Sequence, residues 1–186
     1  MAPYSIRLVG DPVLRQRATE VTDIDGRLAA LAQDMITTMY EAPGAGLAAP
    51  QVGVQRRVFV YDSHDGTGAH VIVNPTITES RGEWTFEEGC LSVPGLSWDI
   101  VRPNEVHLTG WDLDGDEVSI EADEYLGRIF QHELDHLDGI LLLERLDVDT
   151  RKAAMRTLRE RQLTVAALDG EAELAPRRGL RLPGRS

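Results

Sequence analysis

Apolar residues recur at the spacing of a helix face in two stretches of the chain. The first follows Asp25, a residue type suited to capping a helix, and runs to about Tyr40 before Pro43 and Gly44 interrupt it. The second follows Asp123 and ends near Gly139. We therefore expect two helices, each with one face in the core. Their apolar stripes are Leu28, Leu31, Met35 and Met39, and Leu126, Ile129, Phe130, Leu134 and Leu137.

Between these predicted helices the pattern changes to the two-residue period of strands. The predicted strands are Val58–Tyr61, Val71–Val73, Thr76–Thr78, Val106–Leu108 and Val118–Ile120. The acidic segment 112–116 lies between the last two and predicts a hairpin loop. Residues 44–51, with two glycines, are expected to be irregular. A run of strands followed by a helix predicts an α+β protein, in which the second helix packs against antiparallel sheet.

The chain after Leu146 has a different character. Residues 147–150 form a capping signal, and the segment from Arg151 to about Leu168 predicts a C-terminal helix. Residues 169–186 are rich in glycine, proline and arginine, which predicts a disordered tail. The expected organisation is one folded domain over residues 1–168, followed by that tail. The predicted helix is basic, with Arg151, Lys152, Arg156, Arg159 and Arg161.

Composition narrows the class of protein without changing this organisation. The 186 residues carry a formal net charge of −12, which argues against a nucleic-acid binder. A single cysteine excludes an internal disulfide framework and is compatible with a reducing compartment. No apolar run reaches the length of a membrane span, and the N-terminus lacks a signal-peptide pattern. We therefore expect a cytoplasmic protein that binds neither membranes nor nucleic acid directly.

The second predicted helix carries the sequence His-Glu-x-x-His, which is a candidate metal site. Residues His132 and His136 are one turn apart on the same helix face, so their imidazoles can hold one metal ion. Glu133 follows the first histidine and is placed to take a proton from a water molecule at that ion. From this short motif alone, a metal site and a core helix with two partly exposed histidines are about equally expected.

A catalytic metal site of this kind needs a third protein ligand and an open position. The extended metallopeptidase motif has its glycine here, Gly139, but Leu142 stands where its third histidine would be. Cys90 is the remaining upstream candidate, and its charged, glycine-containing surroundings are unlike core sequence. The other residues of suitable type are Glu144 and Glu160, and His64, His70 and His107 in polar or alternating contexts.

Three blocks in this order make the chain resemble the peptide deformylases, metalloenzymes that remove the N-formyl group from new bacterial proteins. The blocks are Gly44–Gln51, Glu88–Ser92 and Gln131–Gly139. Their joint occurrence is far more specific than the histidine motif alone. The resemblance extends from near the N-terminus to about Leu146. It implies an α+β fold whose antiparallel sheets surround a central metal-binding helix, with further helices near each end of the chain.

The same resemblance implies roles for individual residues. Metal ligands would be Cys90, His132 and His136, and the general base would be Glu133. Donors to the reacting oxygen would be the Gln51 side chain and the Leu91 backbone N–H. Substrate would bind along Ala45, Gly46 and Gly89, and Ile129 would form part of an apolar pocket for the methionine side chain. Many relatives carry an arginine shortly after the cysteine block. Here Gly95–Trp98 has none, and the next cation, Arg102, is expected to pair with Glu88 behind the metal ligands.

The resemblance also implies a cofactor and partners. One divalent ion is expected per chain, Fe(II) in the cell, with Zn(II), Ni(II) or Co(II) possible in purified protein. The substrates would be N-formylmethionyl nascent peptides, and the basic C-terminal segment is a candidate for ribosome contact. Two other classes of protein fit the sequence less well. A zinc endopeptidase is disfavoured by Leu142 and by Cys90 as the best third ligand, and a non-catalytic metal protein would need neither Glu133 nor Gln51.

Overall fold

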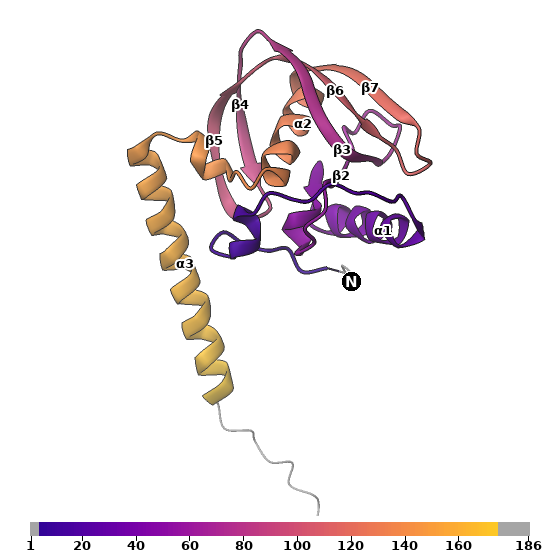
Figure 1. Cartoon of the computed structure of the whole chain (residues 1–186). Coiled ribbons are helices and arrows are strands. Elements are labelled where there is room, and N and C mark those ends of the chain that lie inside the picture. Colours follow the sequence, from indigo (N-terminus) through magenta and orange to yellow (C-terminus); the bar gives the residue numbers. More distant parts are fainter. Residues whose placement is uncertain (1–3, 175–186) are drawn as a thin grey trace, which may run out of the picture. The chain divides into compact units, whose positions relative to one another are not determined.

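The computed structural model describes residues 4–174, with side chains as far as residue 161. The chain divides into two compact units, residues 1–147 and residues 148–186. The first unit holds two sheets and two long helices, and the second holds one helix (Figure 1). The α+β class expected from the sequence is confirmed. None of the helices within residues 4–174 is both long enough and apolar enough to cross a membrane.

The larger sheet is antiparallel and has the strand order β1-β2-β3-β6-β7. Its strands are β1 (Gly46–Ala48), β2 (Val58–Tyr61), β3 (His70–Arg81), β6 (Glu105–Trp111) and β7 (Glu117–Asp123). Strands β4 (Trp84–Cys90) and β5 (Val93–Arg102) pair only with each other and form a separate hairpin. Figure 1 shows helix α2 (Glu124–Leu137) between this hairpin and the larger sheet. Short 3₁₀ turns at Pro12–Arg15, Ala49–Val52 and Leu142–Arg145 complete the unit.

Helix α2 forms where the sequence predicts it because its apolar face packs against apolar residues of the strands. Ile129, Phe130 and Leu137 are buried in one cluster with strand residues. The Phe130 ring packs edge-on against Tyr61 with centroids 5.0 Å apart. Burial of each large side chain stabilises the helix position by about 1.5–3 kcal/mol. Asp123 occupies the N-cap position without a side-chain hydrogen bond, and Gly139 follows the helix in the left-handed conformation.

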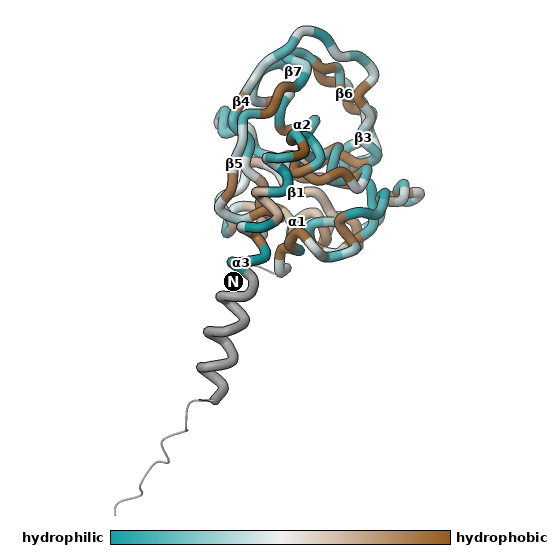
Figure 2. Tube along the Cα trace, turned by 90° about the vertical axis from the view of Figure 1, so that its left-hand side faces the viewer, coloured by the Kyte–Doolittle hydropathy of each residue, from teal (hydrophilic) through white to brown (hydrophobic). Residues whose placement is uncertain are grey.

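Helix α1 (Gly26–Glu41) also matches its prediction. The Asp25 carboxylate accepts hydrogen bonds from the backbone N–H groups of Arg27 and Leu28, and so caps the helix. Leu28, Met35 and Met39 are buried in a second apolar cluster, which also contains residues of the larger sheet. Figure 2 shows hydrophobic segments gathered where α1, α2 and the central strands meet, with hydrophilic segments on the outer loops.

Two of the predicted strands are wrong in detail. Segments 71–73 and 76–78 belong to one strand, β3, interrupted by a bulge at Asn74 and Pro75. Asn74 has a positive φ of 49°, and its side chain bonds both the N–H and the carbonyl of Val21. Proline supplies no ladder donor, so the strand tolerates it only at such a bulge. The local break in alternation hid a continuous strand.

Three strands have no counterpart in the prediction. Strand β1 lies in the segment expected to be irregular, and the β4–β5 hairpin covers the cysteine block. Most hairpin positions are exposed or only partly buried, so an apolar alternation that would reveal a strand is missing. Helix α3 (Val148–Leu174) starts near its predicted position and continues past residue 168 into the predicted tail. The remainder of that tail, residues 175–186, lies outside the described residues.

Candidate active site

The fold brings the single cysteine to the two histidines of α2. Cys90 ends strand β4, and its Sγ lies 3.2 Å from Nε2 of His136. One ligand atom from each of Cys90, His132 and His136 lies within 4.8 Å of the others. Among the described residues no other His, Cys, Asp or Glu group is so arranged. His70 and His107 instead bond the hydroxyl groups of strand and loop residues.

The donor set suits a divalent transition metal. Nδ1 of His132 lies 3.0 Å from a Glu88 carboxylate oxygen, which fixes the ring and leaves Nε2 for an ion. Desolvation raises the pKa of the Cys90 thiol, but the charges and hydrogen bonds of His136 and His132 outweigh it and hold that pKa well below its usual value. A thiolate and two imidazoles are ligands for zinc, iron, cobalt or nickel. Three ligands leave an open position, as a catalytic site requires.

Behind the histidines, Glu88 is paired with three cationic or ring donors. Its Oε1 accepts from Arg102 at 2.7 Å and from Arg128 at 2.8 Å. Its Oε2 accepts from Arg102 at 3.0 Å and faces His132. Desolvation raises the pKa of Glu88, but the hydrogen bonds from His132 and Arg102 prevail and lower it to about 2. The pairing of Arg102 with Glu88 expected from the sequence is therefore present in the structure.

The same arginine also reaches the metal helix. Arg102 donates from Nη1 to Oδ2 of Asp135 at 2.7 Å, and Arg145 donates to both oxygens of that carboxylate. Arg102 and Asp135 are both less than a tenth exposed. Ion pairs at such depth are specific in geometry, because each charge must find partners there. They therefore fix α2 relative to β5.

Glu133 lies on the cavity side of the same helix without a fixed partner. Its side chain is buried, and its Oε2 has no hydrogen-bond partner among the described residues. Desolvation raises its pKa to about 7 against the opposing charges of His132 and His136. A Cβ at Gly46 would lie 2.8 Å from Cδ of Glu133. Only glycine therefore leaves room for this carboxylate.

Gln51 is fully buried and points its amide nitrogen towards the cysteine. Its Oε1 accepts from the backbone N–H of Ala48 at 2.8 Å, which assigns the orientation of the amide. Its Nε2 then lies 3.2 Å from Oγ of Ser92 and 3.9 Å from Sγ of Cys90. Leu91 directly follows the cysteine, between β4 and β5. The segments Gly44–Gln51 and Glu88–Ser92, which are distant in sequence, therefore meet at Gln51.

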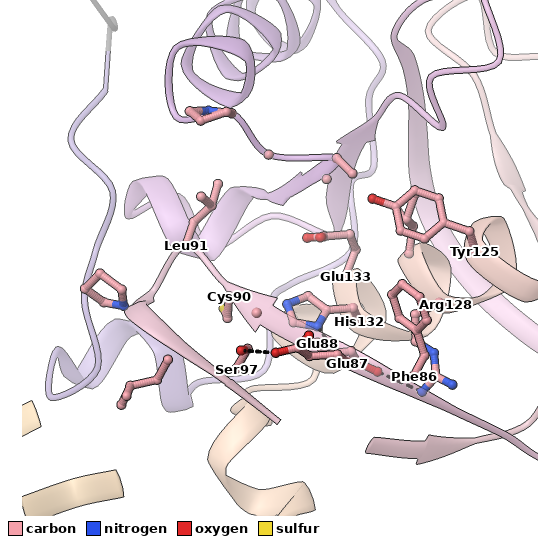
Figure 3. A pocket seen from close by; sticks show the side chains of 18 of the residues that line it. Phe86, Glu87, Glu88, Cys90, Leu91, Ser97, Tyr125, Arg128, His132 and Glu133 are labelled. Atoms are coloured by element: carbon pink, nitrogen blue, oxygen red, sulfur yellow. Dashed lines mark hydrogen bonds and ion pairs between the residues drawn. The ribbon is translucent and has the colours of Figure 1, made fainter. Parts of the chain in front are cut away.

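These groups surround one cavity of about 650 Å³. Figure 3 shows Cys90, His132 and Glu133 on one side, with the Leu91 side chain beside them and Tyr125 farther along α2. The residues expected to contact substrate, Ala45, Gly46, Gly89 and Ile129, all line it, as do Gln51, Glu88 and Leu91. Arg102 and His136 lie behind the lining. The cavity is also lined by Phe86, Tyr125 and Arg128, which were not expected there from the sequence, although Tyr125 and Ile129 are one turn apart on the helix.

Comparison with known proteins gives a consistent result. The family model for polypeptide deformylase matches residues 3–152. A peptide deformylase of Acidothermus cellulolyticus is 47% identical over 96% of this chain and 98% of that protein. Peptide deformylase 1 of Corynebacterium glutamicum is 52% identical over 86% of this chain and 96% of that protein.

Solved structures agree with these sequence relatives. The crystal structure of a peptide deformylase from Legionella pneumophila has a TM-score of 0.83 and 41% identity, covering 88% of this chain and 97% of that one. A Synechococcus elongatus peptide deformylase in complex with actinonin has a TM-score of 0.81 and 37% identity, with coverages of 87% and 89%. This chain belongs to the polypeptide deformylase family, metal-dependent hydrolases that remove the N-formyl group from nascent peptides.

Proposed function

We propose that this chain removes the formyl group of N-terminal formylmethionine with Glu133 as base and with Cys90, His132 and His136 as ligands of one divalent ion. The observation that carries the proposal is that Cys90, His132, Glu133 and Gln51 line one cavity, with a ligand atom of His136 within 4.8 Å of those of Cys90 and His132. The products are formate and a peptide with a free N-terminus.

An ion held by Cys90, His132 and His136 would supply Lewis acidity, which lowers the pKa of water and polarises a carbonyl oxygen. We propose Fe(II) in the cell, and Zn(II), Ni(II) or Co(II) in purified protein, because thiolate and imidazole ligands accept all four. A Cys90→Ser variant tests the ligand set. Replacing the soft thiolate should weaken binding or shift the preference to harder ions, and an unchanged cobalt absorption spectrum would remove Cys90 from that set.

Glu133 takes the proton of the attacking water and later passes it to the leaving amine. Desolvation holds the pKa of this carboxyl at about 7, so the group exchanges a proton readily near neutral pH. Its unpaired Oε2 is available to a water or to the substrate. Negative charge develops on the formyl oxygen during attack, and preorganised donors stabilise it. We assign this role to Nε2 of Gln51 and the backbone N–H of Leu91.

The substrate is proposed to bind as an extended strand. Strand β1 lies at the edge of its sheet, and β4 has β5 on one side only. Both line the cavity, through Gly46 and Gly89. An extended peptide between them would find backbone partners there, with Ala45 and Ile129 against its side chains. Arg102 and Glu88 support the site from behind, by orienting His132.

Location and partners follow from the substrate. Because nascent peptides emerge at the ribosome, we place the enzyme in the cytoplasm. The N-terminal part of α3 carries several cations, and we propose that it contacts the ribosome. These cations are Arg151, Lys152, Arg156, Arg159 and Arg161. Co-sedimentation of the whole chain with ribosomes tests this contact, and replacing these cations with glutamate should reduce binding.

The deciding experiment is formate release from a formyl-methionyl peptide. The protein is prepared without oxygen and loaded with ferrous iron, and an acetyl-methionyl peptide of the same sequence serves as control. We expect formate and a free N-terminus from the formyl peptide, no free N-terminus from the acetyl peptide, and loss of activity with a chelator. Metal-loaded, folded protein that releases no formate would overturn the proposal. Casein hydrolysis instead would indicate an endopeptidase.

A further inference from the structure

Arg128 is a buried arginine of α2 with no role in the chemistry above. Its side chain is 3% exposed. From Nη1 it donates to Glu88 at 2.8 Å and to the Ile100 carbonyl at 3.1 Å, and from Nη2 it donates to the Trp84 carbonyl. Its guanidinium also lies over the Trp84 ring, 5.2 Å from the centroid. One helix residue therefore contacts both strands of the hairpin.

Arg128 is not the only attachment of the hairpin: Val93 and Ile100 of β5 are buried, and the Phe86 ring of β4 packs against Tyr125 of α2. Strands β4 and β5 form ladder hydrogen bonds only with each other. Neither of the two apolar clusters in the described part of the chain has a member in these strands. Charged and polar side chains also cross from the hairpin to α2, through Glu88 with His132 and through Arg102 with Asp135. Arg128 adds the connection with the most separate acceptors.

All acceptor positions of the Glu88 carboxylate are occupied. A carboxylate has about four acceptor positions. Two are filled by Arg102, which is on the hairpin itself, one by His132 and one by Arg128. Arg128 and His132 are thus the two groups that hold the Glu88 carboxylate to the helix. Loss of Arg128 leaves this hairpin carboxylate tied to α2 only through a metal-binding ring.

We propose that Arg128 is a positioning residue that holds the β4–β5 hairpin against α2 and thereby sets the distance between Cys90 and the two histidines. This proposal rests on the metal site proposed above. Metal–ligand distances in protein sites are expected to fall within about 0.2 Å of their standard values. The cysteine ligand is on one element and the histidines are on the other, so a small shift of the hairpin weakens the site.

The test measures metal release from cobalt-loaded protein into excess chelator. Changing Arg128→Met removes all the donors, and we expect release to be about 10–100-fold faster, as for other groups that support metal ligands. Changing Arg128→Lys keeps the charge but cannot reach three acceptors on two strands, so an intermediate rate is expected. The matched control is Arg81→Met, because Arg81 is exposed and pairs with Glu105 on the larger sheet.

Hydrogen exchange of the metal-free proteins separates positioning from general instability. In Arg128→Met, backbone amides of β4 and β5 should exchange faster, while those of β6 and β7 keep their wild-type rates. The proposal is overturned by wild-type release rates in Arg128→Met, or by equal acceleration in Arg81→Met. If Arg128→Met does not fold, a wild-type release rate in Arg128→Lys overturns it. Wild-type protein that holds no cobalt would instead overturn the metal site itself, and this proposal with it.

Discussion

Helix α2 is held in the apolar core, whereas the β4–β5 hairpin is attached to that helix through charged side chains. Around α2, Ile129, Phe130 and Leu137 are buried among strand residues. On the hairpin side, Glu88 and Arg102 make the charged crossing contacts, and Phe86 adds one ring contact with Tyr125. Apolar contact is non-directional, while hydrogen bonds between charged groups restrict both distance and angle. The helix thus provides stability, and the charged contacts provide the accuracy that a site shared by two elements needs.

The largest expected effect lies on the helix side of this comparison. Changing Glu133→Gln keeps the size of the side chain but removes the base, so turnover should fall about 10²–10⁴-fold. Metal content should stay at the wild-type level, because Glu133 is not among the ligands. Steady-state formate release with metal analysis checks both points. Near-normal turnover in the metal-loaded variant would exclude Glu133 as the base.

The next largest effect is expected on the free energy of unfolding, which a substitution on α2 should lower more than one on the hairpin. Phe130 is fully buried on α2, so Phe130→Ala should lower the free energy of unfolding by about 3–5 kcal/mol. Val101 on β5 is 59% exposed, and Val101→Ala should change it by no more than about 0.5 kcal/mol. Urea denaturation of the two variants gives the comparison. Equal losses would mean that the core does not anchor α2 more firmly than the hairpin's outer face.

A variant of Gln51 tests the place where the segments Gly44–Gln51 and Glu88–Ser92 meet. Gln51→Leu is nearly the same size and lacks the donor, so turnover should fall by roughly 10²–10³-fold, about 2.7–4 kcal/mol. A fall in kcat with KM nearly constant identifies a donor to the transition state. A change confined to KM would make Gln51 a binding residue only. Unchanged kinetics would remove it from the site.

The smallest expected effect concerns salt. Arg102 and Arg128 are both less than a twentieth exposed, so added ions should screen their pairs poorly. Cobalt release from the wild type should therefore change by less than roughly twofold between low salt and about 1 M, where the Debye length is ~3 Å. Release that accelerates steeply with salt would show that the charged contacts are open to solvent.

The difference between the two elements also explains what the sequence could predict. The spacing of Phe130 and its neighbours indicates a helix because burial imposes a period on the residue pattern. On the hairpin strands the buried apolar residues are Val93 and Ile100, which are too far apart in the sequence to show a two-residue period. From its surroundings Cys90 is only a candidate ligand, and its assignment comes from the resemblance, because its approach to His136 depends on pairing between distant segments. The contacts of Arg128 depend on the same pairing and were not predicted.

One further consequence concerns the single cysteine and oxygen. Cys90 borders a cavity open to substrate, and neighbouring groups favour its thiolate form. Thiolates are the form that oxidants convert to sulfenic acid. The chain contains no second cysteine, so a sulfenic acid here has no internal thiol with which to form a disulfide. Recovery of the thiol then depends on an external reductant.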